Sequence, residues 1–152
     1  MYHKTHSVII RLVAIMLVLV LVVPANVSAA ASETVQPYAS SYLSSYNSYI
    51  YPAGSGRVQV WFTIRGTGVM DELGMLTIQL YESKDNSTWT WLKTYSHQNY
   101  PSMLGYDEWI HEGYVQYQGI GGRYYKAYVC VWGGKDGAGD TRYFWTPSQQ
   151  VI

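Results

Sequence analysis

The side chains best suited to acid–base chemistry are concentrated in one irregular stretch of the sequence, residues 97–113. Two carboxylates can serve as general acid and base, and a histidine beside carboxylates can hold a metal ion. This stretch contains no H-E-x-x-H motif and no second histidine one helical turn away. The sequence therefore favours a non-catalytic domain without a metal site or cofactor, and a small hydrolase using Asp107, Glu108 or His111 is the alternative. The candidate residues are His97, Asp107, Glu108, His111 and Glu112.

Three other motifs are better explained by turns or packing than by chemistry. Asp136 and Asp140 lie in "KDGAGD", but the further oxygen ligands of a calcium loop are missing, which favours a hairpin turn. Asn86 begins the N-glycosylation pattern "NST", yet the surrounding "SKDNST" is itself turn-forming. Cys130 is the single cysteine, so no disulfide can form within the chain. It is interpreted as a small apolar side chain, with an intermolecular disulfide as the alternative.

Aromatic side chains are the most unusual feature of the sequence, because 16% of the residues are Phe, Trp or Tyr and nearly all of these are Tyr or Trp. Such side chains combine a large contact area with a polar tip, which suits protein interfaces and the flat faces of sugars. Strand alternation predicts that Trp61, Tyr81, Tyr128 and Trp132 point outward, and if they are exposed together they form an apolar patch of the kind that marks a binding face. The sequence slightly favours the interpretation that these rings cover the sheets and stiffen a domain that has no disulfide, and a dedicated binding face is the second interpretation.

Four more aromatic residues lie in strand-like segments. Tyr143 and Trp145 share one face of the last segment, whose direction the pattern leaves open. Trp89 and Trp91 are predicted to serve core and hairpin packing rather than ligand contact.

Alternating apolar and polar residues predict the strands that carry these side chains. In "RVQVWFTIR" the inward residues are Val58, Val60, Phe62 and Ile64, and in "MLTIQLYE" they are Leu76, Ile78 and Leu80. The glycine-punctuated "GTGVMDELG" between them predicts a turn. In "YYKAYVCVW" the inward residues are Tyr125, Ala127, Val129 and Val131.

The remaining segments complete an all-β pattern. "SKDNST" followed by "WTWLKTY" predicts a hairpin, residues 97–113 a long loop, and "YVQYQG" a further strand. "GGKDGAGD" predicts a turn into a last strand, "TRYFWT". Six or seven strands with short turns, and no predicted helix after Ala29, indicate a single antiparallel β-sandwich.

Two of these stretches resemble known all-β domains. "GGRYYKAYVCVW" and "GGKDGAGDTRYFWTP" resemble the last two strands of immunoglobulin-like and fibronectin-type-III-like domains, and "LTIQLYESKDNSTWTWLKTY" resembles a central hairpin of such a sandwich. Residues 40–150 are also similar to small secreted proteins of Gram-positive bacteria of unknown function. The resemblance implies about seven strands and places Tyr124 or Tyr125 at a tyrosine corner, without the inter-sheet disulfide. Such a likeness supports the fold and assigns no role.

The segment from Met1 to Ala29 has the order of a secretory signal peptide: Lys4 and Arg11, then an apolar run from Leu12 to Val23, then Pro24 and small residues. The apolar run is too short to span a bilayer, which needs roughly 20 apolar residues. Cleavage is predicted after Ala29, with Ala30 or Ala31 as alternatives. The sequence thus predicts a signal peptide (1–29), an extended Ser/Tyr-rich leader with a first strand (30–51) and a β-sandwich (52–152).

The predicted product is released into the extracellular space or cell envelope without a stable membrane anchor. After loss of Lys4 and Arg11 its formal charge is about −2, and no basic stripe remains for nucleic acid. The sequence therefore predicts an extracellular binding or interaction domain whose partner is an unidentified protein or glycan. A carbohydrate- or cell-wall-binding module that uses the surface aromatics is the second hypothesis.

Overall fold

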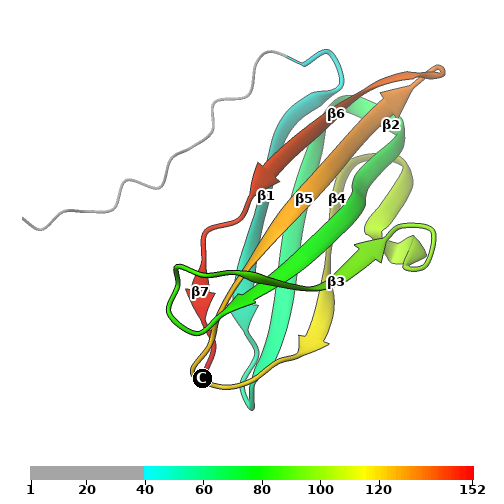
Figure 1. The fold of residues 1–152 in the computed structure, drawn as a ribbon. Helices are drawn as coiled ribbons and strands as arrows, with labels where there is room; N and C mark the ends of the chain where they lie inside the picture. The colour runs from blue at the N-terminus through cyan, green and yellow to red at the C-terminus, as the bar shows by residue number, and fades with distance from the viewer. Residues whose placement is uncertain (1–39) are drawn as a thin grey trace, which may run out of the picture. The chain divides into compact units, whose positions relative to one another are not determined.

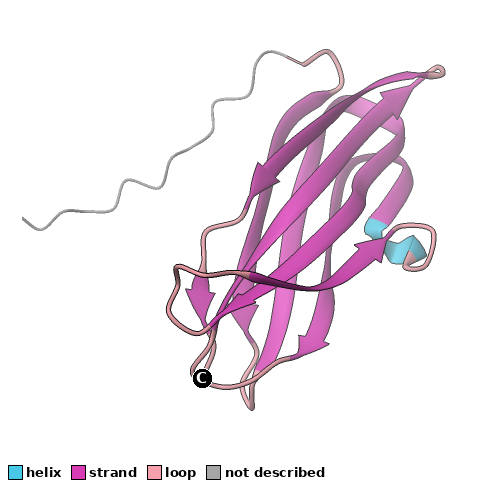
Figure 2. Ribbon diagram, in the orientation of Figure 1, coloured by secondary structure: helices cyan, strands magenta, loops and turns pink. Residues whose placement is uncertain are grey.

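The computed structural model describes residues 40–152, which form an antiparallel β-sandwich (Figure 1). The predicted signal peptide and the first part of the leader lie outside the described residues. Figure 2 shows strands throughout, with one short helical turn beside β3. Within residues 40–152 there is no helix of the length and apolar character needed to cross a membrane. The elements are β1 (Leu43–Pro52), β2 (Arg57–Ser83), β3 (Thr90–Ser96), the 3-10 turn η1 (Pro101–Met103), β4 (Leu104–Gln118), β5 (Tyr124–Lys135), β6 (Ala138–Trp145) and β7 (Gln149–Gln150).

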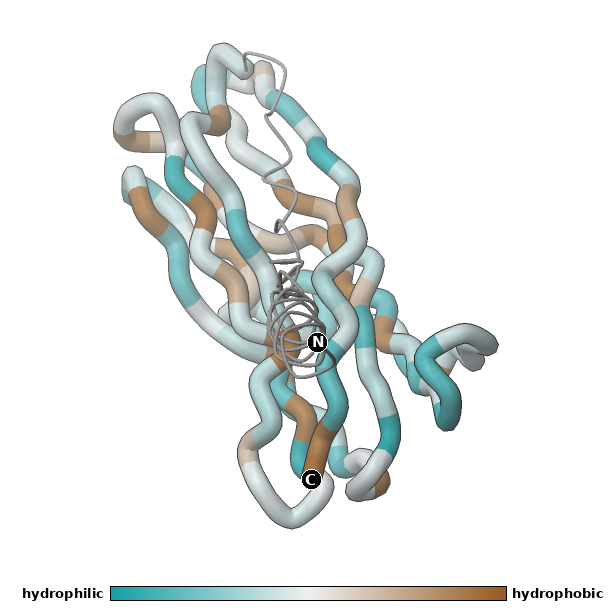
Figure 3. The backbone as a smooth tube through the Cα atoms, turned by 90° about the vertical axis from the view of Figure 1, so that its left-hand side faces the viewer, coloured by the Kyte–Doolittle hydropathy of each residue, from teal (hydrophilic) through white to brown (hydrophobic). Residues whose placement is uncertain are grey.

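The long strand β2 takes part in both layers of the sandwich. Its first half pairs with β1 on one side and with most of β4 on the other, which gives the first layer. Its second half pairs with β3 and β5, and β5 continues to β6, which gives the second layer. All pairings are antiparallel, so the predicted fold class is confirmed. Figure 3 shows hydrophobic and hydrophilic segments alternating along the strands.

The predicted turn at "GTGVMDELG" is wrong, because β2 continues through it as a bent strand of 27 residues. The register with β4 shifts between Arg65 and Met70, so β2 has extra residues here and bends. A Cβ on Gly66 would lie 2.7 Å from Cγ of Met70. Only glycine therefore fits where the bent strand passes close to the Met70 side chain. The glycines therefore mark a bend within a strand and not its end.

The predicted long loop over residues 97–113 is also wrong in its larger part. Residues 97–100 and η1 form the connection, and β4 begins at Leu104, well before the predicted strand "YVQYQG". The first residues of β4 pair with Leu73 and Gly74 of β2, and its later residues pair with Arg57 to Arg65. The acidic composition of these residues did not indicate a strand, because their backbone pairs with β2, which is distant in the sequence.

The core lies between the layers and follows the predicted alternation closely. The inward residues of β5 and of the first half of β2 are at most 1% exposed, and burying such side chains contributes about 1.5–3 kcal/mol each before chain entropy. One inward assignment is wrong: Leu76 is only partly buried, because a register shift between Met75 and Thr77 puts Met75 in the core. The confirmed inward residues are Val58, Val60, Phe62, Ile64, Ile78, Leu80, Tyr125, Ala127, Val129 and Val131.

Tyr125 is the residue that occupies the tyrosine-corner position. Its hydroxyl accepts a hydrogen bond from the backbone N–H of Ile120 at 2.8 Å, five positions upstream. The same hydroxyl donates to Oε2 of Glu82 at 2.7 Å, and Oε1 of Glu82 accepts from Nη1 of Arg123 at 2.5 Å. This small network joins β2 to the start of β5.

A second buried tyrosine joins β3 to β4. Tyr95 is 1% exposed, and its hydroxyl donates to the backbone carbonyl of Gln116 at 2.8 Å. Burial raises the pKa of Tyr95 to about 12, with smaller contributions from Tyr100 and Tyr117. Burial also raises the pKa of Tyr125 to about 12, reinforced by its hydrogen bond to Glu82. Both phenols are therefore held neutral by the fold.

The free energy of unfolding should fall in alkaline solution because of these two phenols. In the unfolded chain they ionise near pH 10.0, whereas in the folded protein they stay protonated to about pH 12. Their contribution is fully present below pH 10 and is lost between pH 10 and 12, by about 1.4 kcal/mol per pH unit for each group. Urea unfolding at pH 9 to 12 measures this slope, and Tyr125→Phe should reduce it by about half. Unchanged stability of the wild type from pH 9 to 12 would show that the two phenols do not stay protonated in the folded protein.

Candidate functional site

The four predicted binding residues lie on the outer faces of the strands but in two different layers. Trp61 belongs to the first layer, where it is paired across the strands with Tyr49 and Tyr114. Its ring stacks on Tyr114 with centroids 4.7 Å apart. Tyr81, Tyr128 and Trp132 belong to the second layer, on the opposite side of the sandwich. The structure therefore does not bring Trp61 together with the other three.

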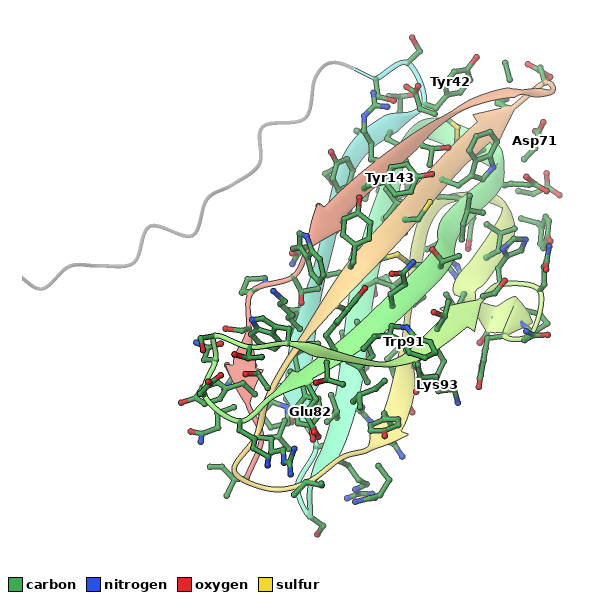
Figure 4. The ribbon with its side chains drawn as sticks, in the orientation of Figure 1. Tyr42, Asp71, Glu82, Trp91, Lys93 and Tyr143 are labelled. Atoms are coloured by element: carbon green, nitrogen blue, oxygen red, sulfur yellow. The ribbon has the colours of Figure 1, made fainter. Side chains whose placement is uncertain are left out.

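The outer side of the second layer carries a set of neighbouring rings that we call the outer aromatic face. Trp145 lies 5.1 Å from the ring of Tyr81 and 4.9 Å from that of Tyr128, and Tyr128 stacks on Tyr143 at 6.1 Å. Figure 4 shows Tyr143 and Trp91 on the side of the molecule that faces the viewer. The face consists of Tyr81, Trp89, Trp91, Tyr128, Tyr143 and Trp145.

Several of these rings are largely exposed to solvent. The exposed fractions are 60% for Tyr143, 56% for Trp91 and 47% for Trp145. The side chains of Tyr143 and Trp145, whose direction the sequence left open, thus point outward. The prediction that Trp91 serves core or hairpin packing is wrong. A register shift between Leu80 and Tyr81 places Trp91 directly opposite Tyr81, and so on the outer side.

Lys126 is inserted between two tryptophans of the outer aromatic face. Its Nζ lies 4.2 Å from the ring centroid of Trp89 and 4.4 Å from that of Trp145. An ammonium over the face of an indole is attracted by the ring's negative quadrupole. The lysine therefore fixes two tryptophans that come from different parts of the chain.

Cys130 lies on the same side of β5 but is covered. The residue is 5% exposed, and the ring of its cross-strand partner Tyr143 stands over this position. Burial raises the pKa of the thiol, and a hydrogen bond with the Tyr143 side chain acts in the opposite direction. These features fit the interpretation of Cys130 as a small packing residue.

Trp132, the last predicted binding residue, borders a hollow at one end of the second layer. The hollow has a volume of about 490 Å³ and is also lined by Asp71, Glu72, Tyr106 and Lys135. Nε1 of Trp132 donates a hydrogen bond to Oε2 of Glu72 at 3.0 Å. Four strands, β2, β4, β5 and β6, and the turn between β5 and β6 contribute to this hollow, which no short motif in the sequence could indicate.

The candidate acid–base residues do not form one site. Nδ1 of His111 contacts Oε1 of Glu108 at 2.5 Å, and its Nε2 contacts the carbonyl of Ser102 at 3.0 Å. This pair ties η1 to β4. Glu112 instead accepts a hydrogen bond from Thr63, and Nδ1 of His97 faces the carbonyl of Leu76. Asp107 is exposed with a φ of 55°.

The two aspartates near the β5–β6 turn are also apart. The backbone N–H of Asp136 donates to Oδ2 of Asp71, whereas Asp140 accepts hydrogen bonds from Ser40 and Arg142. Among residues 40–152, no group of three or more His, Cys, Asp or Glu side chains is arranged to hold a metal ion.

The loop that contains Asn86 is organised by its own aspartate. Oδ1 of Asp85 accepts the backbone N–H groups of Ser87 and Thr88, each at 2.9 Å. These hydrogen bonds hold the pKa of Asp85 well below its usual range, and the bond from Thr88 has the largest effect. Asn86 is exposed and adopts a φ of 61°, as expected at a tight turn.

Comparison of the chain with protein-family models, with curated proteins and with solved structures found no match.

Replacing Lys126 by methionine should destabilise the domain by about 1–2 kcal/mol. Methionine keeps most of the apolar stem but removes the charge that contacts two indoles, each contact being worth about 0.5–1 kcal/mol. Urea unfolding followed by tryptophan fluorescence measures the loss. Lys84→Met, at an exposed lysine of the β2–β3 loop, is the matched control. Equal effects of the two substitutions would show that the charge of Lys126 contributes nothing.

Proposed function

We propose that this protein is a non-catalytic module that binds polysaccharide outside the cell through its outer aromatic face. The observation that carries the proposal is the unbroken contact of Tyr81, Trp145, Tyr128 and Tyr143 across three neighbouring strands. The planes of Tyr128 and Tyr143 are within 19° of each other, whereas Trp145 is tilted against Tyr128, and exposed aromatic faces suit the faces of sugar rings. Three rings of the face keep about half or more of their area in solvent, so they are available for contact.

The arrangement of the predicted acid–base residues also supports binding over hydrolysis by this group. A hydrolase that used them would need its carboxylates to converge in a concave site. Glu108 is instead paired with His111, and Glu112 faces Thr63 in the first layer. Exposed aromatic residues suit the binding of sugars, and the second layer presents Trp91, Tyr143 and Trp145 to solvent.

The extracellular location is part of the proposal and rests on the sequence from Met1 to Ala29. The basic start, apolar run and small residues of this segment are typical of an exported protein. The fold is compatible with that environment, because its only cysteine is buried and its stability comes from packing. The cell wall or another extracellular glycan is therefore the proposed partner.

Retention on insoluble polysaccharide tests this proposal. Purified protein is incubated with cellulose, chitin and isolated bacterial cell walls, and the bound fraction is measured. Trp145→Ala should weaken retention about tenfold, since a central aromatic anchor commonly contributes about 1.4 kcal/mol or more. Trp61→Ala, at a half-buried tryptophan of the other layer, is the matched control and should bind as the wild type does.

Two results would contradict the proposal. Absence of retention on all three materials would leave the aromatic face without a glycan ligand and direct attention to protein partners. Equal loss of retention in Trp61→Ala and Trp145→Ala, with both variants folded by circular dichroism, would show that the outer aromatic face is not the specific contact surface.

A further inference from the structure

The hollow beside Trp132 lies at one end of the outer aromatic face and continues its surface. Tyr128, Cys130, Trp132 and Gly134 follow one another on the outer side of β5. Two residues of strand advance by about 6.6–6.8 Å, so Trp132 is one such step beyond the position that Tyr143 covers. Figure 4 shows Asp71 at the end of the molecule where β5 turns into β6.

The indole ring of Trp132 lies flat against the backbone of β5 and β6 and does not project away from the sheet. A Cβ on Gly134 would lie 2.6 Å from the ring, and a Cβ on Gly139 would lie closer still. Gly134 and Gly139 are paired across β5 and β6, so together they leave a flat space without side chains. The ring therefore lies along the sheet while bordering the hollow.

Hydrogen-bonding groups surround this flat ring. Glu72 is paired with Tyr106 on one side and with Gly134 on the other, which places it between Tyr106 and the indole of Trp132. One oxygen of Glu72 accepts from Trp132, and Asp71 accepts from the backbone N–H of Asp136 at 2.7 Å. Each carboxylate has a second oxygen, and the Lys135 ammonium and the Tyr106 hydroxyl add donors.

We propose that this hollow is a subsite that binds one ring of a neutral glycan, whose further units lie along the outer aromatic face. The proposal rests on the proposed function and specifies its ligand class. An apolar sugar face would pack on Trp132, and its hydroxyl groups would donate to Glu72 and Asp71. Two carboxylates disfavour an acidic sugar, and Lys135 disfavours a simple cation. The volume of about 490 Å³ is within the usual range for small-ligand sites.

Calorimetric titration with three soluble oligosaccharides tests the subsite. Cellohexaose and chitohexaose are the neutral probes, and hexagalacturonate is the acidic one. Glu72→Ala removes the central acceptor, and Gly134→Ala displaces the indole without removing it. Glu112→Ala, at a carboxylate of the first layer, and Gly68→Ala, where a Cβ would meet nothing within 4 Å, are the matched controls.

We expect at least one neutral hexasaccharide to bind, with about tenfold loss in Glu72→Ala and in Gly134→Ala and no change in the two controls. Hexagalacturonate should bind at least tenfold more weakly than that neutral probe. Thermal unfolding of each variant establishes that the fold is retained.

The possible failures are distinguishable. If Trp145→Ala loses binding while Glu72→Ala and Gly134→Ala bind as the wild type does, the subsite is refuted and the proposed function stands. Preference for hexagalacturonate would refute the neutral ligand class. If the wild type binds none of the probes and is retained on none of the insoluble materials, the proposed function and the subsite fail together.

Discussion

The structure depends on one continuous strand that serves both layers. β2 pairs with β1, β3, β4 and β5, and its bend after Arg65 turns the second half of the strand onto the other layer. The layers share this backbone and pack on one apolar core, so they are held together without a disulfide. The buried hydroxyls of Tyr95 and Tyr125 add cross-strand bonds at both sides of the core.

The same alternation that fills the core also creates the outer aromatic face. When Tyr125, Ala127 and Val129 point inward, Lys126 and Tyr128 must point outward. The rings on neighbouring strands then come into contact, and the attraction of Lys126 to two indoles helps to offset the entropy lost in ordering them. Core packing and a preorganised binding surface are thus two consequences of one strand pattern.

Local features could be predicted well from the sequence and long-range ones poorly. Inward residues such as Val60 and Val129 follow from a period of two, since that signal is contained in a few neighbouring positions. The strand nature of residues 104–113 could not be predicted, because it depends on pairing with β2, which is distant in the sequence. The outward direction of Trp91 could not be predicted either, because it depends on a register shift. The hollow at Trp132 could not be predicted, because it requires β2, β4, β5 and β6 together.

The most direct test of the central claim is to follow the six indole N–H signals by NMR while a soluble glycan that the protein binds is added. We expect the signals of Trp91, Trp132 and Trp145 to change, since these side chains lie on the second layer along the proposed contact surface. The signal of Trp61, on the opposite layer, should stay unchanged. Changes confined to Trp61, with the signals of the second layer unaffected, would show that the second layer is not the contact surface.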